Sequence, residues 1–166
     1  YMNGFSNVEP RTQDDGTTKS FSPEHANQWE VGVKADAFGE RLTATLSYYD
    51  ITVSNVVRED PDRANFYVQN GEQYSRGLEA SVKAAPAKGL TLTAGYSYNE
   101  SEVTRGSAEY EGRRPEEAGP QNLVNAWASY RVTSGVFEGI GVGVGGNYAS
   151  KNLILNRATT GQFTLP

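Results

Sequence analysis

The residues best suited to bind a charged group lie in one polar stretch of the sequence, Thr104–Gly119. This stretch contains Arg105, Tyr110, Arg113 and Arg114. An arginine offers a planar fork of hydrogen-bond donors and a flat surface for stacking, which suits the binding of anions. The same stretch allows a second interpretation, a solvated loop in which the arginines are neutralised by Glu109, Glu111, Glu116 and Glu117. A second stretch mixes both charges in the same way, with Arg58, Asp60, Asp62 and Arg63.

Two pairs of opposite charges recur with the same spacing, Glu30 with Lys34 and Glu79 with Lys83. A carboxylate and an ammonium group could serve as an acid–base pair. However, both pairs belong to similar segments, WEVGVKA and LEASVKA, which begin 49 residues apart. Their repetition along the sequence indicates a polar lining rather than a single active site.

The composition excludes several kinds of site. The chain contains no cysteine, so it has neither a disulfide scaffold nor a thiolate metal site. Its single histidine, His25, is not sufficient for a His-rich metal centre and has no recognisable partner for hydrolytic catalysis. A net charge of −5 argues against binding of nucleic acid, which requires a basic surface. We therefore expect no catalytic residues, no metal site and no resident cofactor.

The segments that position these charges alternate between apolar and polar residues, the pattern of a β-strand with two different surroundings. In Leu90–Asn99, one face carries Leu, Ala and Tyr, and the other carries Thr, Gly, Ser and Asn. Trp127 is an exception on an otherwise polar face. Beyond Tyr49 the apolar set changes phase, which predicts a bulge or an exit from the membrane. The other alternating segments are 29–34, 42–49, 78–83, 124–130 and 140–148.

This alternation fits either a soluble β-sandwich or a transmembrane β-barrel. The apolar faces carry small residues and tyrosines and no charge, whereas a packed core would prefer Leu, Ile and Phe. A Lys or Arg at the lipid midplane would cost about 2–4 kcal/mol. The opposite faces carry Glu and Lys inside the strands, which a watery lumen accepts and a dry core does not. We therefore predict an all-β fold, a transmembrane antiparallel barrel.

The connections between these segments alternate in length, as they do in outer-membrane barrels with short periplasmic turns and long extracellular loops. The short ones lie near 35–40, 85–89 and 133–139, and the long ones near 8–26, 58–66, 104–119 and 151–161. Four tyrosines fall toward the end with long loops, where an aromatic girdle is expected: Tyr48, Tyr96, Tyr98 and Tyr148.

Several motifs in this order resemble those of TonB-dependent siderophore receptors. Pro23-Glu24 followed by Trp29–Lys34 is similar to one of their strands, and Gln69–Glu72 followed by Ser75–Glu79 is similar to a later segment. The strand from Gly89 to Tyr98 is similar to the one that comes next in the family. The resemblance covers most of Pro23–Tyr148.

The resemblance implies a barrel of about 22 strands around an N-terminal plug. At about 9–11 residues per spanning strand, 166 residues supply roughly seven or eight strands. We therefore expect residues 1–166 to be part of the barrel domain, without the plug and the remaining strands. The implied function is uptake of a ferric siderophore across the bacterial outer membrane, energised through the plug by the TonB–ExbB–ExbD complex. Outer-membrane lipids would surround the barrel, and Arg105, Tyr110, Arg113 and Arg114 would be candidates for capturing the ligand outside.

Other functions stay open at this point. A complete barrel of about eight strands with a structural or adhesive role would have a similar length. An outer-membrane lipase or protease would need a partner for His25. Among importers, haem, cobalamin or a glycan are alternative substrates, although a haem importer would typically offer two histidines.

Overall fold

A computed structural model of the chain describes residues 2–3, 11–12, 18–19, 21–60, 62, 66–106, 110–157 and 161–165. Apart from one short 3-10 helix, η1 (Glu116–Ala118), the regular structure in these ranges is β-sheet. The four short strands near the ends of the chain form two separate pairs, β2 (Arg11–Thr12) with β3 (Thr18–Lys19) and β10 (Asn152–Arg157) with β11 (Gly161–Leu165). Among the described residues, no helix has the length and apolar character needed to cross a membrane.

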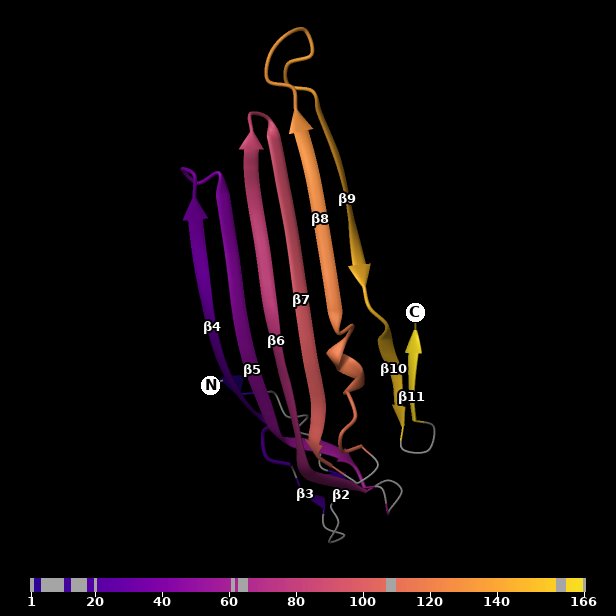
Figure 1. The fold of residues 1–166 in the computed structure, drawn as a ribbon. Helices are drawn as coiled ribbons and strands as arrows, with labels where there is room; N and C mark the ends of the chain where they lie inside the picture. Colours follow the sequence, from indigo (N-terminus) through magenta and orange to yellow (C-terminus); the bar gives the residue numbers. More distant parts are fainter. Residues whose placement is uncertain are drawn as a thin grey trace.

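The other seven strands form one antiparallel sheet in the order β1-β4-β5-β6-β7-β8-β9, so neighbours in the sheet from β4 onward are also neighbours in sequence (Figure 1). This arrangement confirms the predicted all-β antiparallel fold. The strands are β1 (Met2–Asn3), β4 (His25–Ala37), β5 (Leu42–Glu59), β6 (Tyr67–Ala87), β7 (Leu90–Arg105), β8 (Asn122–Arg131) and β9 (Gly141–Ala149).

The connections follow the predicted difference between the two ends of the sheet only in part, because residues 132–140 at the short-turn end outnumber residues 60–66 at the other end. At the upper end in Figure 1, β4 leads to β5, β6 to β7 and β8 to β9 through residues 38–41, 88–89 and 132–140. At the lower end, residues 60–66 and 106–121 join β5 to β6 and β7 to β8. The strands β5, β6 and β7 have 18, 21 and 16 residues, which exceeds the about 9–11 needed to span a bilayer. Parts of the expected long loops are therefore strand, including Arg58 and Arg105.

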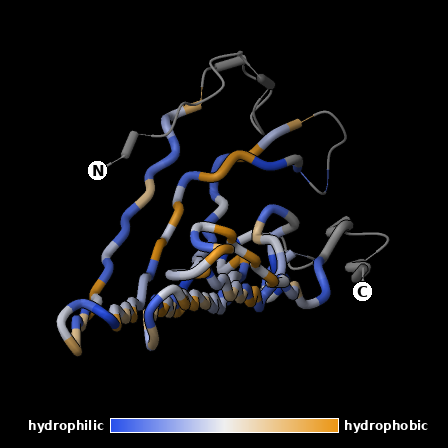
Figure 2. The backbone as a smooth tube through the Cα atoms, turned by 90° about the horizontal axis from the view of Figure 1, so that it is seen from above, coloured by the Kyte–Doolittle hydropathy of each residue, from blue (hydrophilic) through white to orange (hydrophobic). Residues whose placement is uncertain are grey.

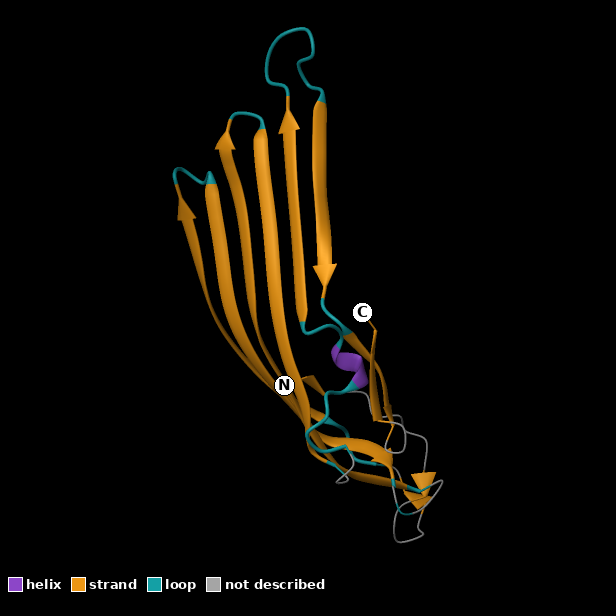
Figure 3. Ribbon diagram, turned by 45° about the vertical axis from the view of Figure 1, so that its right-hand side comes forward, coloured by secondary structure: helices purple, strands orange, loops and turns teal. Residues whose placement is uncertain are grey.

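The sheet has two faces of different character. Cross-strand pairing places Val31, Tyr48, Leu78 and Tyr98 in one row of the apolar face, and Gly32, Ser47, Glu79 and Ser97 in one row of the polar face. No hydrophobic side chain in the described part of the chain is buried. The strands form a single curved layer (Figure 3), and apolar and polar residues alternate along them (Figure 2). A sandwich would cover the apolar face with a second sheet, so the sandwich interpretation is wrong for this chain.

The apolar face ends abruptly toward the long connections. The rings of Trp29 and Tyr48 lie 5.2 Å apart there, and Tyr98 lies in the same cross-strand row as Tyr48. The next row on this face joins Trp29 to three charged residues, Asp50, Arg76 and Glu100, and in it Arg76 forms an ion pair of 3.0 Å with Glu100. The aromatic girdle is therefore at the predicted end of the strands, and the charged row lies beyond the band suited to lipid.

Of the two explanations predicted for the change of phase after Tyr49, a bulge or an exit from the membrane, the structure fits the second. Pairing between β5 and β6 is continuous from Leu42 to Ser54, and the register shifts at Asn55, which has φ of 60°. Ile51 and Val53 therefore share the polar face with Tyr49. The change of phase marks the exit of the strands from the apolar band: beyond the girdle the former apolar face becomes charged, and the opposite face packs against the β7–β8 connection.

Candidate ligand-binding site

The repeated Glu and Lys residues line the polar face in separate rows. Glu79 lies opposite Ser47 and Ser97, and Lys83 lies opposite Thr43 and Thr93. Lys34 forms an ion pair of 3.6 Å with Asp36 rather than with Glu30. This arrangement is a distributed polar lining, in which neither Lys34 with Glu30 nor Lys83 with Glu79 forms the acid–base pair that the sequence suggested.

At the end with the long connections, Arg114 holds the β7–β8 connection against the polar face. Its guanidinium donates to the backbone carbonyl of Asn99 at 2.9 Å and to the side-chain oxygen of Asn99 at 2.7 Å. It also donates to the carbonyl of Gly119 at 3.1 Å. Burial lowers the pKa of Arg114, although Tyr98, Tyr49 and Glu100 act in the opposite direction. Arg114 therefore uses its charge-assisted donors to fix the connection.

The acceptor of these bonds is itself held in place. The side-chain nitrogen of Asn99 donates to the hydroxyl oxygens of Tyr49 and Ser75, at 2.9 and 2.7 Å. The buried hydroxyl of Ser101 donates to the side-chain oxygen of Asn99 at 2.8 Å. Both ends of the Asn99 amide are thus satisfied, so β5, β6 and β7 together orient the group that anchors Arg114.

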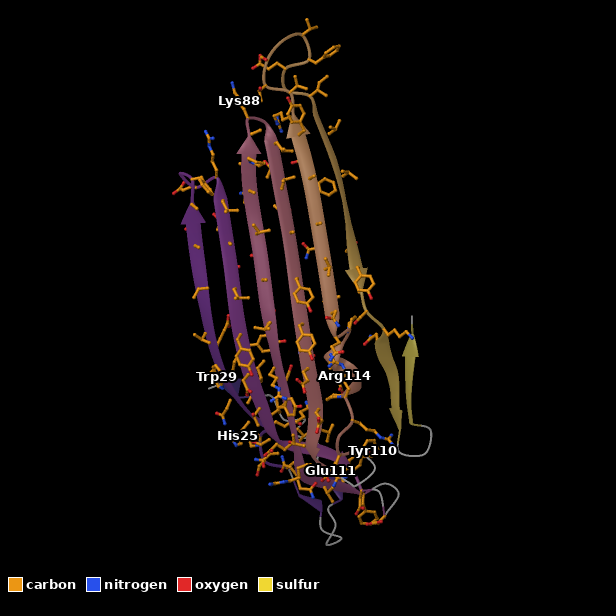
Figure 4. The ribbon with its side chains drawn as sticks, in the orientation of Figure 1. His25, Trp29, Lys88, Tyr110, Glu111 and Arg114 are labelled. Carbon is orange, nitrogen blue, oxygen red and sulfur yellow. The ribbon has the colours of Figure 1, made fainter. Side chains whose placement is uncertain are left out.

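Backbone hydrogen bonds extend this attachment toward Tyr110. The amide of Val103 donates to the carbonyl of Arg113 at 2.9 Å, and the amide of Gly112 donates to the carbonyl of Val103 at 3.0 Å. Glu111 accepts a hydrogen bond from the amide of Gly106 at 3.0 Å. Tyr110, Glu111 and Arg114 consequently lie near one another at the lower end of the sheet (Figure 4). The connection is a structured element across 110–119.

Between this connection and the ends of β5, β6 and β7 lies a hollow of about 280 Å³. It brings together two of the four predicted capture residues, Arg105 and Tyr110. Arg113 and Arg114 are not among the described residues that line it. The remaining lining residues are Val56, Arg58, Gly71, Glu72, Gln73, Val103, Pro115 and Glu117.

The alternative in which glutamates neutralise the arginines is only partly visible. Glu117 lines the hollow, but Glu111 accepts from a backbone amide. Glu109 and the side chain of Glu116 lie outside the described residues. The hollow is lined by two arginines, Arg58 and Arg105, and by two glutamates, Glu72 and Glu117, which give it a mixed charge.

Arg58 is the residue of this hollow whose role the sequence did not reveal. The sequence places it at the start of a charged loop, whereas the structure places it in β5, three residues after the bulge at Asn55. The bulge shifts the alternation, so Val56 and Arg58 join the polar-face residues Gln73 and Val103 around the hollow. The Nε atom of Arg58 donates to the side-chain oxygen of Asn70 at 3.1 Å, while one terminal nitrogen is buried without a hydrogen-bond partner among the described residues.

Within the described ranges, no group of three or more His, Asp or Glu residues is arranged to hold a metal ion. The hollow instead combines guanidinium groups, a phenol ring and carboxylates. Such a site can donate forked hydrogen bonds and stack on a flat ligand.

The family model described as TonB dependent receptor-like, beta-barrel, matches residues 1–165. The chain is 30% identical over 152 residues to the ferrichrome outer membrane transporter/phage receptor of Escherichia coli, covering 92% of this chain and 20% of that protein. It is 29% identical over 168 residues to the ferrioxamine B receptor of Salmonella typhimurium, covering 99% of this chain and 24% of that protein. The chain thus spans about a fifth to a quarter of the length of these relatives.

Solved structures show the same fold. The ferric preacinetobactin receptor from Acinetobacter baumannii matches with a TM-score of 0.71 and 27% identity, over 98% of this chain and 24% of that one. The ferripyoverdine receptor of Pseudomonas aeruginosa matches with a TM-score of 0.70 and 19% identity, over 99% of this chain and 22% of that one. The sheet described above is therefore a segment of this type of barrel wall.

Proposed function

The chain belongs to the TonB-dependent receptors, a family of outer-membrane β-barrels, and on this premise we propose that it forms part of a receptor that imports ferric siderophores. The relatives named for ferrichrome, ferrioxamine B and ferric pyoverdine support this substrate class. Because the chain covers about a fifth of such proteins, the activity belongs to the whole receptor. This segment would contribute wall, lumen lining and part of the outer capture surface.

The observation that carries the proposal for this segment is the hollow at the end with long connections. Arg58, Arg105 and Tyr110 converge there from β5, β7 and the β7–β8 connection. Ferric siderophores are often anionic, which suits the forked donors of Arg58 and Arg105, and the ring of Tyr110 adds a surface for stacking. We infer that this hollow contacts the ferric siderophore as it enters from outside. Arg113 and Arg114 contribute indirectly, by holding the β7–β8 connection in position.

The remaining roles follow from the same proposal. Uptake makes and breaks no covalent bond, so no enzymatic step is assigned to this chain. The ferric siderophore is cargo rather than a cofactor. Energy would come from the TonB–ExbB–ExbD complex acting on the plug, while lipids cover the apolar face.

The test is a binding and uptake assay with the full-length receptor. Binding of ferrichrome, ferrioxamine B and ferric pyoverdine is measured for the unmodified protein and for Arg58→Gln combined with Arg105→Gln. We expect the double variant to lose about tenfold or more in affinity for the ligand that binds, since two charge-assisted contacts of at least 1.4 kcal/mol in total would be lost. Arg131→Gln, at the opposite end of the sheet, is the matched control.

Two outcomes would contradict the proposal at different levels. If the double variant binds as tightly as the control, the hollow is not part of the capture surface. If a strain that lacks the receptor takes up every ferric chelate normally under iron limitation, the cargo is another class. Haem, cobalamin and glycan uptake are then measured in the same strain.

A further inference from the structure

The β8–β9 connection, residues 132–140, is a fixed loop at the short-turn end that presents apolar side chains outward. Four backbone hydrogen bonds define its shape: Val132 to Ile140 at 2.8 Å, Gly139 to Val132 at 2.9 Å, Glu138 to Gly135 at 3.1 Å and Ile140 to Phe137 at 3.1 Å, donor first in each. At its tip, Val136 is 97% exposed and Phe137 is 67% exposed. A loop held in this way keeps two adjacent hydrophobic side chains uncovered, which is typical of a surface that meets an apolar partner.

The loop is continuous with the apolar face of the barrel wall. Val132 and Ile140 extend the ladder by one pair beyond its last one, Arg131 with Gly141. By alternation Ile140 shares a face with Val142 and Val144, and these three side chains are 54%, 70% and 73% exposed. The same stripe thus runs from the lipid-facing surface of β9 to the base of the loop.

Of the two neighbouring turns, 38–41 also carries an exposed aromatic side chain, Phe38 at 80%, whereas 88–89 carries none. Residues 88–89 between β6 and β7 are only Lys and Gly, and Lys88 points away from the end of the sheet (Figure 4). The β8–β9 connection also projects farther than the other two turns in Figure 1. It therefore reaches beyond the edge of the wall, with Val136 and Phe137 at its tip and Arg131 at its base.

We propose that loop 132–140 lies in the interfacial layer of the bilayer on the short-turn side, with Val136 and Phe137 inserted among lipid chains. Aromatic and aliphatic side chains are stable at this depth because the ring contacts the chains while nearby polar groups stay hydrated. The partner is the phospholipid surface itself, and the loop anchors this end of the wall. The inference rests on membership of the barrel family and is independent of the cargo.

The experiment uses the full-length receptor in liposomes of phosphatidylethanolamine and phosphatidylglycerol. Nitroxide labels are attached to single cysteines at Val136→Cys, Phe137→Cys, Ser134→Cys in the same loop and Val142→Cys on the apolar face. Collision rates with oxygen, which concentrates in lipid, and with a water-soluble nickel complex are compared. We expect the oxygen-to-nickel ratio at 136 and 137 to exceed that at 134 severalfold and to approach that at 142.

Two results would overturn the proposal. If positions 136 and 137 match Ser134→Cys, the tip lies in water. If both positions are shielded from oxygen and from nickel, protein covers the tip. Folding of every variant is checked by its heat-dependent migration on gels, and Phe137→Trp with quenching by brominated lipids gives a second measurement that needs no label.

Discussion

The guanidinium of Arg114 binds both oxygens of Asn99, the backbone carbonyl at 2.9 Å and the side-chain amide oxygen at 2.7 Å. These two residues join the β7–β8 connection to the middle of the sheet's polar network. Tyr110 belongs to the same connection and lines the hollow. The hydrogen bonds between Arg114 and Asn99 therefore also fix the position of one wall of the hollow. Arg114, which the sequence suggested as a ligand-capture residue, thus has a structural role.

Replacing Arg114 is expected to loosen the connection. Hydrogen bonds to a charged group contribute about 1.5–3 kcal/mol, so Arg114→Gln should raise the frequency of local opening about 10- to 100-fold. Hydrogen exchange of peptides that contain the amides of Val103 and Gly112 measures this opening. Arg131→Gln, at the other end of the sheet, should leave these amides unchanged. Equal exchange in the Arg114→Gln variant and the unmodified receptor would show that Asn99 does not anchor the connection.

A second prediction concerns the close approach of the strands at Gly77. A Cβ atom there would lie 2.1 Å from the carbonyl oxygen of Tyr98 and 2.6 Å from the hydroxyl of Tyr49. Since the first of these is backbone, Gly77→Ala should destabilise the barrel by about 1–3 kcal/mol. The matched control is Gly146→Ala, where nothing lies within 4 Å. Urea midpoints of the refolded full-length receptor compare the two variants, and an equal loss in both would contradict the prediction.

The sheet could be predicted from the sequence because its cause is local and periodic. The alternation in Leu90–Asn99 assigns each side chain to a face, and cross-strand pairing in the structure agrees. The position of the girdle followed from Tyr48 and Tyr98 in the same way. The lengths of β5 and β6 could not be predicted in this way. Both strands continue past the apolar band into charged segments, where alternation no longer indicates a buried face.

The candidate site was only half predictable. Arg105 and Arg114 have the same residue type in the same polar stretch, yet one lines the hollow and the other binds Asn99, 15 residues away. Arg58 reaches the hollow because of the bulge at Asn55, for which the sequence has no clear signal. Hydrogen bonds between distant residues and shifts of register decide these roles, and neither is encoded in local periodicity.

Trp127, the exception to the alternation, gives a third prediction. Its indole lies across β9, and a Cβ atom added to Gly143 would come within 2.6 Å of the Trp127 ring. Gly143→Ala should therefore cost about 1–3 kcal/mol when Trp127 is present and much less in a Trp127→Ala background. A double-mutant cycle on unfolding free energy measures this coupling. If the effects of the two substitutions are additive, the indole can move aside freely. The presence of glycine at position 143 would then need another explanation.

The last prediction concerns Tyr74, which lies beyond the girdle on the charged side of the sheet. Burial raises the pKa of the Tyr74 phenol, and hydrogen bonds of 3.2 and 3.3 Å to Glu100 and Glu102 act in the same direction. Arg76, whose guanidinium carbon lies 4.7 Å from the centre of the ring, lowers that pKa. The folded receptor therefore favours the neutral phenol. The resulting stabilisation is complete below the unfolded pKa, near 10, and is lost as the pH rises through the higher folded value.

Alkaline titration of phenolate absorbance, as the difference between the unmodified receptor and Tyr74→Phe, isolates this group. We expect a midpoint above 10, the usual value. Glu100→Gln should lower the midpoint because it removes a negative charge, whereas Arg76→Gln should raise it because it removes the opposing positive charge. The two variants thus shift the pKa of Tyr74 in opposite directions, which a general loss of folding would not do. A difference midpoint at or below 10 would show that water reaches the phenol freely and that neither carboxylate binds it.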